Sequence, residues 1–241
     1  AAVSYLNTKP LIYGFEKGLM NQEIELITDF PASSADMLLQ DKVDIALVPV
    51  AVIPQLKEHY IISDYCIGAD GEVVSVCLLS DVPIKEIKTV LLDPESRTSV
   101  ELLKILLTDL WKVHPELVNA EQGYEDKIKG NIAGLVIGDR AFIQRKKAKY
   151  IYDLGAVWKA FTGLPFVFAA WVANKKLPDS FIADFNTATR EGLNHLPEII
   201  AENPYEHYDL KKYFSENISF VLDAEKRKGL EEFFRISEIK M

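Results

Sequence analysis

Apolar and polar positions alternate along the first fifty residues with two different periods, which predict strands and helices in turn. The expected order is strand, helix, strand, helix, strand, over residues 1–6, 10–19, 24–30, 33–40 and 43–48. Pro10 supports the first helix, because a missing N–H costs nothing in the first helical turn. Residues 43–48 are apolar except for Asp44, and such a run is typical of a fully buried strand. This alternation favours a parallel sheet.

A second group of elements follows two strand-like runs, residues 60–69 and 73–79, which the strong turn signal Asp70-Gly71 separates. The second group is expected to contain strands at 89–92, 117–120 and 133–137 and helices at 99–111 and 124–129. Because it repeats the strand-helix alternation of the first group, it predicts a second α/β lobe.

The last third of the chain predicts a return to the first lobe. Residues 164–173 are apolar and β-rich, as expected of a strand that carries the chain back, and apolar residues after Pro178 recur three and four apart, as on buried helix faces. We therefore expect an α/β protein with residues 1–78 and 174–241 in lobe 1 and residues 79–173 in lobe 2. Two crossings between lobes suit a two-hinge binding-protein architecture, with its ligand between the lobes.

The charge balance excludes several classes of partner. The 241 residues carry a formal net charge of -9, so we expect neither nucleic acid nor a membrane as partner. No apolar run approaches the ~20 residues that span a bilayer. The short basic run at 145–149 is typical of a solvated helix face. A small anion is still compatible with the sequence, because helix N–H groups bind anions whatever the net charge.

The first candidate site is the turn after the first strand. Asn7, Thr8 and Lys9 precede Pro10 there, so polar side chains and free helix N–H groups would meet at the mouth of a cleft. This arrangement suits an anion or a hydroxyl group. The alternative is that Asn7 or Thr8 only caps the helix.

The second candidate site is the segment 96–99, which follows the first strand of lobe 2. Thr98 and Glu101 have the spacing of a capping box, which predicts a helix start at this point. Hydroxyl, amide and guanidinium groups lie together at that helix N-terminus, so Ser99 and Arg97 are candidates for binding a carboxylate.

Other candidates are less specific. Ser75 is the hydroxyl residue of an apolar strand, and it either bonds the backbone or faces the cleft. The aromatic stretch 154–168 contains Thr162 and Gly163 as donors, and it forms either the wall of a pocket or part of the core. Asp139 follows a predicted strand and is expected to reach the same cleft, although an adjacent Asp-Arg pair is usually structural.

Several familiar kinds of site are missing from the sequence. The four histidines have no metal-ligand spacing, and the chain has neither a phosphate-binding glycine loop nor a nucleophile elbow. We therefore expect no metal and no nucleotide cofactor. Cys66 and Cys77 lie in apolar surroundings and predict two buried thiols rather than a disulfide.

The motifs together resemble the chorismate dehydratase family of the futalosine route to menaquinone, over nearly the whole chain. The matching segments are Ser4-Tyr5-Leu6-Asn7 with Pro10, Glu72-Val73-Val74-Ser75-Val76, Ser96-Arg97-Thr98-Ser99, Gly138-Asp139-Arg140 and Thr162-Gly163-Leu164-Pro165-Phe166. The resemblance implies a periplasmic-binding-protein-like type II fold and a cytoplasmic enzyme without cofactors. It would dehydrate chorismate to 3-[(1-carboxyvinyl)oxy]benzoate.

The resemblance also assigns roles to residues. Asn7 and Ser75 match the polar active-site positions, and Thr98 with Ser99 match the substrate-binding helix start. Val50 departs from the pattern, because many relatives carry a serine there. Since aromatisation drives the reaction, positioning by Asn7 and Ser75 is expected to suffice, with the proton passing to the enolpyruvyl carboxylate of the substrate.

Two other functions compete with this interpretation. A 1,4-dihydroxy-6-naphthoate synthase-like enzyme of the same pathway would be expected to carry a cleft histidine, and the cleft motifs contain none. A non-catalytic solute-binding protein for a small anion would share the fold. The sequence leaves open whether the protein is a monomer or a homodimer. The enzyme hypothesis requires Asn7, Ser75 and Thr98 to face one cavity.

Overall fold

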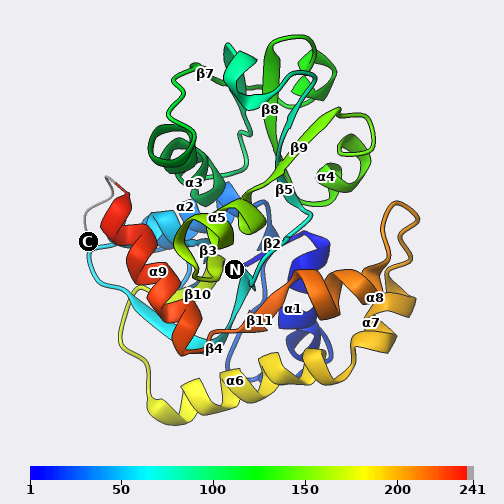
Figure 1. Ribbon diagram of the computed structural model, residues 1–241. Coiled ribbons are helices and arrows are strands. Elements are labelled where there is room, and N and C mark those ends of the chain that lie inside the picture. Colours follow the sequence, from blue (N-terminus) through cyan, green and yellow to red (C-terminus); the bar gives the residue numbers. More distant parts are fainter. Residues whose placement is uncertain (238–241) are drawn as a thin grey trace.

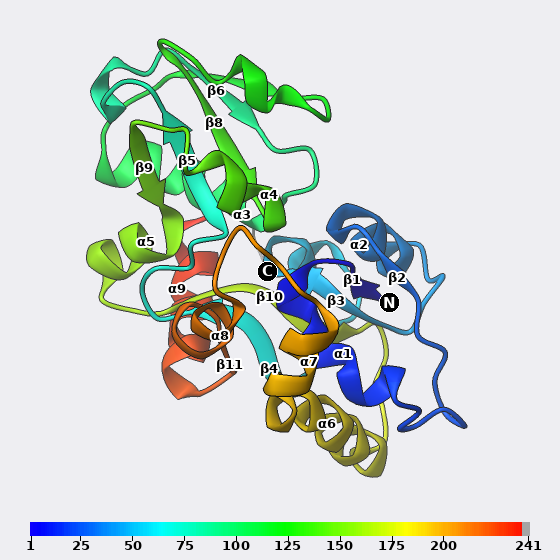
Figure 2. The same cartoon turned by 90° about the vertical axis from the view of Figure 1, so that its right-hand side faces the viewer.

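The computed structural model describes residues 1–237, which form two α/β lobes (Figure 1). Lobe 2 consists of the green segments at the top of Figure 1, and lobe 1 contains both the blue and cyan segments and the orange and red ones. Figure 2 shows from the side that the two lobes remain distinct bodies. The early and late parts of the chain thus build lobe 1 together.

Lobe 1 is built on an antiparallel sheet with the strand order β11-β4-β10-β3. Its strands are β11 (Ser219–Val221), β4 (Tyr60–Ala69), β10 (Phe166–Ala173) and β3 (Ile45–Pro49). The short strands β1 (Ala2–Val3) and β2 (Thr28–Asp29) pair in parallel, and the bond from Leu47 N to Ala1 O, 2.9 Å long, links β1 to β3.

The expectation of a parallel sheet in lobe 1 was only partly right. β10 returns from lobe 2 and inserts between β3 and β4, and it pairs antiparallel with both. β10 is buried along its whole length, which explains why its sequence is continuously apolar. The predicted strands at 1–6 and 24–30 shrink to the two-residue strands β1 and β2.

Helices cover the lobe 1 sheet. They are α1 (Lys9–Glu16), α2 (Pro31–Leu39), α6 (Asp179–Asn194), α7 (Leu196–Glu202), α8 (Leu210–Lys212) and α9 (Ala224–Ile236). α1 packs along α6, and α9 packs on β10. The π-helical turn Tyr213–Asn217 follows α8 and precedes β11. The sequence pattern predicted helices after Pro178 correctly, but it missed β11.

Lobe 2 is built on a mixed sheet with the strand order β7-β6-β8-β5-β9. Its strands are β5 (Val76–Ser80), β6 (Thr89–Leu92), β7 (Glu116–Asn119), β8 (Ile132–Ile137) and β9 (Tyr150–Asp153). Its helices are α3 (Thr98–Ile105), α4 (Asp139–Gln144) and α5 (Leu154–Thr162). The sequence analysis did not predict β9 as a strand or residues 154–162 as a helix.

The chain crosses between the sheets at residues 70–75 and 163–165. By sheet membership β5 therefore belongs to lobe 2 and β10 to lobe 1. The expected limit at 78/79 falls inside β5. The expected limit at 173/174 falls directly after β10, which places β10 in lobe 2. Asp70-Gly71 does not close a hairpin, because β4 and β5 lie in different sheets. Cys66 in β4 and Cys77 in β5 are free and buried, as predicted.

Candidate active site

A cavity of about 70 Å³ lies between the lobes, where strands of both sheets end. Residues at or just after the carboxyl ends of β1, β3, β6 and β8 line it, as expected of a ligand site in α/β folds. Its polar lining consists of Tyr5, Asn7, Ser75, Glu95, Ser96, Arg97, Thr98 and Ser99, and Gly138 also lines it. Asn7, Ser75 and Thr98 thus share one cavity, which the enzyme hypothesis required.

Ser75 lies immediately before β5, and its side chain is hydrogen-bonded on the lobe 1 side. The Tyr213 hydroxyl donates to Ser75 Oγ at 2.8 Å, from the π-helical turn near the end of the chain. Tyr213 is fully buried, and burial raises the pKa of its hydroxyl, so it stays protonated as a donor. The sequence left two choices for Ser75, and the structure has both, because Ser75 lines the cavity and its Oγ donates to the backbone at Val73 O at 3.4 Å.

The start of α3 is built differently from the predicted capping box. Ser96 Oγ accepts the hydrogen bond from Ser99 N at 3.2 Å, so Ser96 rather than Thr98 supplies the capping oxygen. Thr98 Oγ1 instead accepts from Ala51 N of lobe 1 at 3.2 Å. Thr98 therefore links the lobes, because the chain turns one residue earlier than the capping pattern suggested.

Several further contacts cross the cleft and hold the lobes together. Arg97 Nη2 pairs with Asp36 of α2 at 2.6 Å. The guanidinium that was predicted to bind a ligand carboxylate is therefore partly engaged by Asp36. The Tyr5 hydroxyl donates to Glu95, and Leu6 N lies 3.4 Å from both carboxylate oxygens of Asp139.

The loop between α7 and α8 adds a second set of contacts between the lobes. In Figure 2 this orange loop rises toward α4 of lobe 2. The Tyr205 hydroxyl donates to Asp139 O at 2.8 Å, and Tyr208 stacks on Phe142 of α4 at a centroid distance of 4.8 Å. The cavity is therefore small in this conformation because aromatic and polar contacts close it on two sides.

A buried charge cluster lies behind Tyr5 and Glu95. Arg140 approaches Asp93 at 2.9 Å, Glu95 at 3.3 Å and Glu125 at 3.1 Å, so three carboxylates share one guanidinium. Burial raises the pKa of Asp93, and Arg140 opposes that shift. Arg140 is thus a structural residue, as the adjacent Asp-Arg pair suggested. Its charge also compensates Glu95, which lines the cavity.

The pKa of Asp139 makes the stability of the protein depend on pH. Burial raises its pKa to about 6, against an ordinary value of about 3.9 in an unfolded chain. Between these two values the folded protein binds more protons than the unfolded chain, so this contribution to stability falls as the pH rises from about 4 to 6.

Asn at position 139 removes the charge that burial disfavours. We expect Asp139→Asn to raise the melting temperature at pH 8 by about 2–4 °C, the effect of about 1 kcal/mol in a protein of this size, and to have little effect at pH 4. Thermal denaturation of both proteins across this pH range measures the difference. A difference that does not change with pH would contradict the assignment.

Some predicted site residues do not reach the cavity lining. Thr162 donates to Trp158 O at 3.0 Å at the end of α5, and Gly163 ends that helix with φ 76°. Trp158 is fully buried in the core, so most of this stretch belongs to the core, and Phe168 is its one aromatic residue among those that line the cavity. Thr8 is buried beside Asn7, and Val50 is buried in the core next to the lining residue Pro49. Asp139 lies in an adjoining outer hollow with Tyr5 and Glu95.

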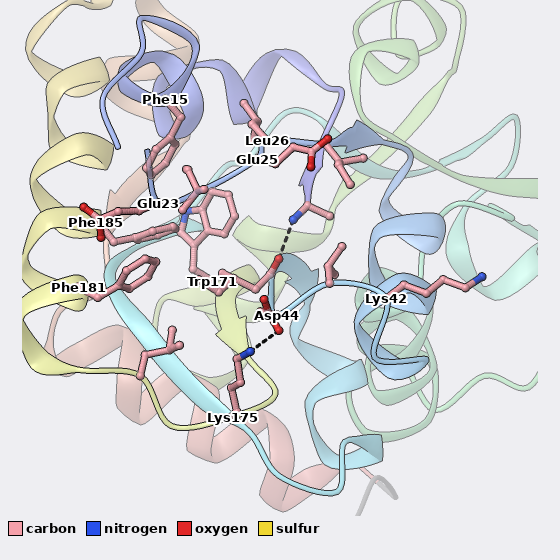
Figure 3. A pocket seen from close by; sticks show the side chains of 16 residues that line it. Phe15, Glu23, Glu25, Leu26, Lys42, Asp44, Trp171, Lys175, Phe181 and Phe185 are labelled. Carbon is pink, nitrogen blue, oxygen red and sulfur yellow. Dashed lines mark hydrogen bonds and ion pairs between the residues drawn. The ribbon is translucent and has the colours of Figure 1, made fainter. Parts of the chain in front are cut away.

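A larger pocket of about 350 Å³ lies in lobe 1, at the other end of β3 (Figure 3). Phe15, Trp171, Phe181 and Phe185 form its aromatic side, and Lys175 pairs with Asp44 at its rim at 2.5 Å. None of the predicted site residues lines this pocket. The smaller cavity between the lobes is therefore the candidate active site.

Sequence reasoning missed two polar residues of the cavity lining, Tyr5 and Glu95, and one residue that bonds the lining residue Ser75, Tyr213. Tyr5 lies in the first motif and Glu95 directly precedes the segment 96–99. Neither was predicted as a site residue, because their contact joins segments ninety positions apart. Tyr213 lies in a stretch read only as helical. No local pattern could have found its contact with Ser75 across 138 residues.

The comparisons with known sequences agree with the cleft motifs. The family described as menaquinone biosynthesis matches residues 1–238 of the chain. A chorismate dehydratase of Thermus thermophilus is 27% identical over 252 residues, which cover 95% of this chain and 91% of the relative. Within residues 1–237, no helix has the length and apolar character needed to cross a membrane.

Solved structures show the same two-lobed arrangement. A protein of Archaeoglobus fulgidus has a TM-score of 0.74 at 14% identity, covering 98% of this chain and 94% of its own. The alkanesulfonate-binding protein SsuA of Xanthomonas axonopodis pv. citri, solved with MOPS, has a TM-score of 0.62 at 9% identity, covering 98% and 91%. These likenesses show a periplasmic-binding-protein-like fold, as expected. With that fold, and with the family match running from residue 1 to residue 238, the chain belongs to the menaquinone biosynthesis family.

Proposed function

We propose that this protein is a chorismate dehydratase, which converts chorismate to 3-[(1-carboxyvinyl)oxy]benzoate and water at the start of the futalosine route to menaquinone. The observation that carries the proposal is the shared cavity of Asn7, Ser75 and the start of α3. The 27% identical relative with the same activity in its name supports it. We further propose that the enzyme acts in the cytoplasm, without a cofactor, as a monomer or homodimer.

Binding would require the lobes to open. Pockets for small ligands usually measure ~300 Å³ or more, whereas this cavity measures about 70 Å³. Opening would break the contacts of Arg97 with Asp36 and of Tyr5 with Glu95, and would free Arg97 to meet a carboxylate of the substrate. Thr98, Ser99 and Arg97 would bind that carboxylate at the start of α3.

The reaction follows from what surrounds the substrate. The ring proton beside the enolpyruvyl ether passes to the enolpyruvyl carboxylate of the substrate, and its electron pair enters the ring as the bond to the ring hydroxyl breaks. The released hydroxide takes up that same proton from the carboxylate and leaves as water. Asn7 and Ser75 hold the ring and the departing hydroxyl, and closure of the lobes excludes bulk water.

The test is incubation of the purified protein with chorismate. We expect aromatic proton signals of the enolpyruvyl benzoate to replace the cyclohexadiene signals in NMR spectra. A parallel preparation of an Asn7→Ala, Ser75→Ala double variant controls for contaminating enzymes. Unchanged chorismate, together with thermal stabilisation by a different small anion, would overturn the proposal.

That outcome would favour a solute-binding protein, which is the second candidate. The structural neighbour that binds alkanesulfonates is the observation in its favour. The sister enzyme of the pathway is disfavoured, because none of the four histidines lines the cavity between the lobes.

A further inference from the structure

A strained turn lies directly before Ser75, in the first connection between the lobes. Val74 has φ 59°, a conformation that is a genuine outlier for a β-branched residue. Ser75 N donates to Val73 O at 2.7 Å, so residues 73–75 form a γ-turn whose central residue has positive φ, the rare and strained type. Strain of this kind persists only where the surroundings enforce it.

The Asp153 carboxylate is the group that enforces this turn. Its Oδ1 accepts from Val73 N at 3.0 Å, and its Oδ2 accepts from Val74 N at 2.7 Å. Oδ1 also caps α5 through Ala156 N at 3.1 Å. Asp153 is 7% exposed, and although burial raises its pKa, the three backbone N–H groups act in the opposite direction.

The start of α5 is fitted closely to the turn. A Cβ at Gly155 would lie 2.5 Å from Gly71 O and 3.2 Å from the Val73 side chain. Only glycine therefore lets the helix bring Asp153 against both N–H groups. The carboxylate, the close approach of the helix and the strained valine form one unit in the connection that carries Ser75.

We propose that Asp153 is a positioning residue that holds the strained Val73–Ser75 turn, so that Ser75 faces the cavity where Tyr213 donates to it. The inference rests on the proposed function, since it assigns Ser75 a role in turnover. Without the carboxylate, Val74 relaxes to negative φ, and the peptide plane that leads into Ser75 turns. The Ser75 hydroxyl then leaves its place beside Tyr213.

Asp153→Asn tests this inference, because asparagine keeps one acceptor oxygen but cannot accept from both N–H groups. We expect kcat on chorismate to fall about thirtyfold, with KM changed less than about threefold. Asp209→Asn is the matched control, since Asp209 caps α8 in the same way but is exposed and has no strained turn. It should leave kcat unchanged.

A rescue experiment separates positioning from mere stabilisation of α5. Glycine adopts positive φ without strain, so Val74→Gly in the Asp153→Asn background should restore kcat about tenfold. If Asp153→Asn does not fold, Asp153→Ser is used instead, because serine keeps a capping oxygen for α5 but cannot bond the N–H groups of the turn. Val74→Gly should restore kcat in that background too. An absence of rescue in a folded double variant would overturn the proposal.

A second measurement does not depend on the reaction. The Cα and Cβ NMR shifts of Val74 report its positive φ in the wild type, and they should move toward extended values in the Asp153→Asn variant. If the wild type does not convert chorismate, the proposed function fails while the shifts still decide the role of Asp153. Unchanged shifts in the variant would refute that role.

Discussion

Replacing Ser75 by alanine should lower kcat/KM for chorismate by about 10²–10³-fold, the usual effect of losing one preorganised hydrogen-bonding group in an active site. Ser75 is 1% exposed, lines the cavity between the lobes and is fixed by Tyr213 at 2.8 Å. Alanine removes the hydroxyl that would hold the departing group, and it leaves the Tyr213 hydroxyl without its acceptor. Asn7→Ala should lose a similar factor. Steady-state kinetics measure both effects.

Ser63→Ala is the matched control for the loss of a buried hydroxyl. Ser63 is 2% exposed and donates to Asn186 at 2.8 Å within lobe 1, away from the cavity lining. Its replacement should cost about 1 kcal/mol of stability and leave kcat/KM unchanged. Full turnover by both Asn7→Ala and Ser75→Ala would refute the catalytic assignment.

Replacing Gly138 by alanine should lower kcat/KM by about 10–100-fold, through the closure of the lobes. Gly138 has φ 65°, and a Cβ there would lie 2.9 Å from the Tyr5 ring. The ring has to move, and its contact with Glu95 across the cleft is lost with it. The variant should also be less compact in solution, which small-angle X-ray scattering measures alongside the kinetics.

Gly130→Ala is the control for the backbone cost of positive φ. Gly130 has φ 61°, close to that of Gly138, but nothing lies within 4 Å of a Cβ there. It should lose stability from the backbone and keep its kcat/KM. Equal kinetic losses in both variants would show that backbone strain, and not Tyr5, limits closure.

Local sequence patterns predicted most elements of the fold, because the spacing of apolar residues indicates the buried face of each strand or helix. Residues 60–69 and 89–92 were placed with the observed limits, and residues 164–173 were correctly read as the return strand. The pairing of β10 was not predictable in the same way. An apolar run shows that a strand is buried, but it does not show which neighbours it has or in which direction they run.

The residues of the candidate site also divide into those that a local pattern predicts and those that a distant contact defines. Asn7 and residues 97–99 were candidates because they follow predicted strands, and strand ends of α/β sheets converge, whereas Ser75 was a candidate as the hydroxyl residue of an apolar strand; all of them line the cavity. Tyr213 and Asp153 were missed, because each acts through a contact more than seventy positions away. The positive φ of Val74 also left no mark on the sequence, since valine is the residue least expected there.

The insertion of β10 between β3 and β4 sets the order in which the protein can be assembled during translation. Lobe 2 is contiguous in the chain, so it can fold on the ribosome while the first seventy residues still lack their central strand. Tyr213 emerges later still. A nascent chain therefore lacks the contact between Tyr213 and Ser75 until its last elements are synthesised, so the candidate site is completed only at the end of translation.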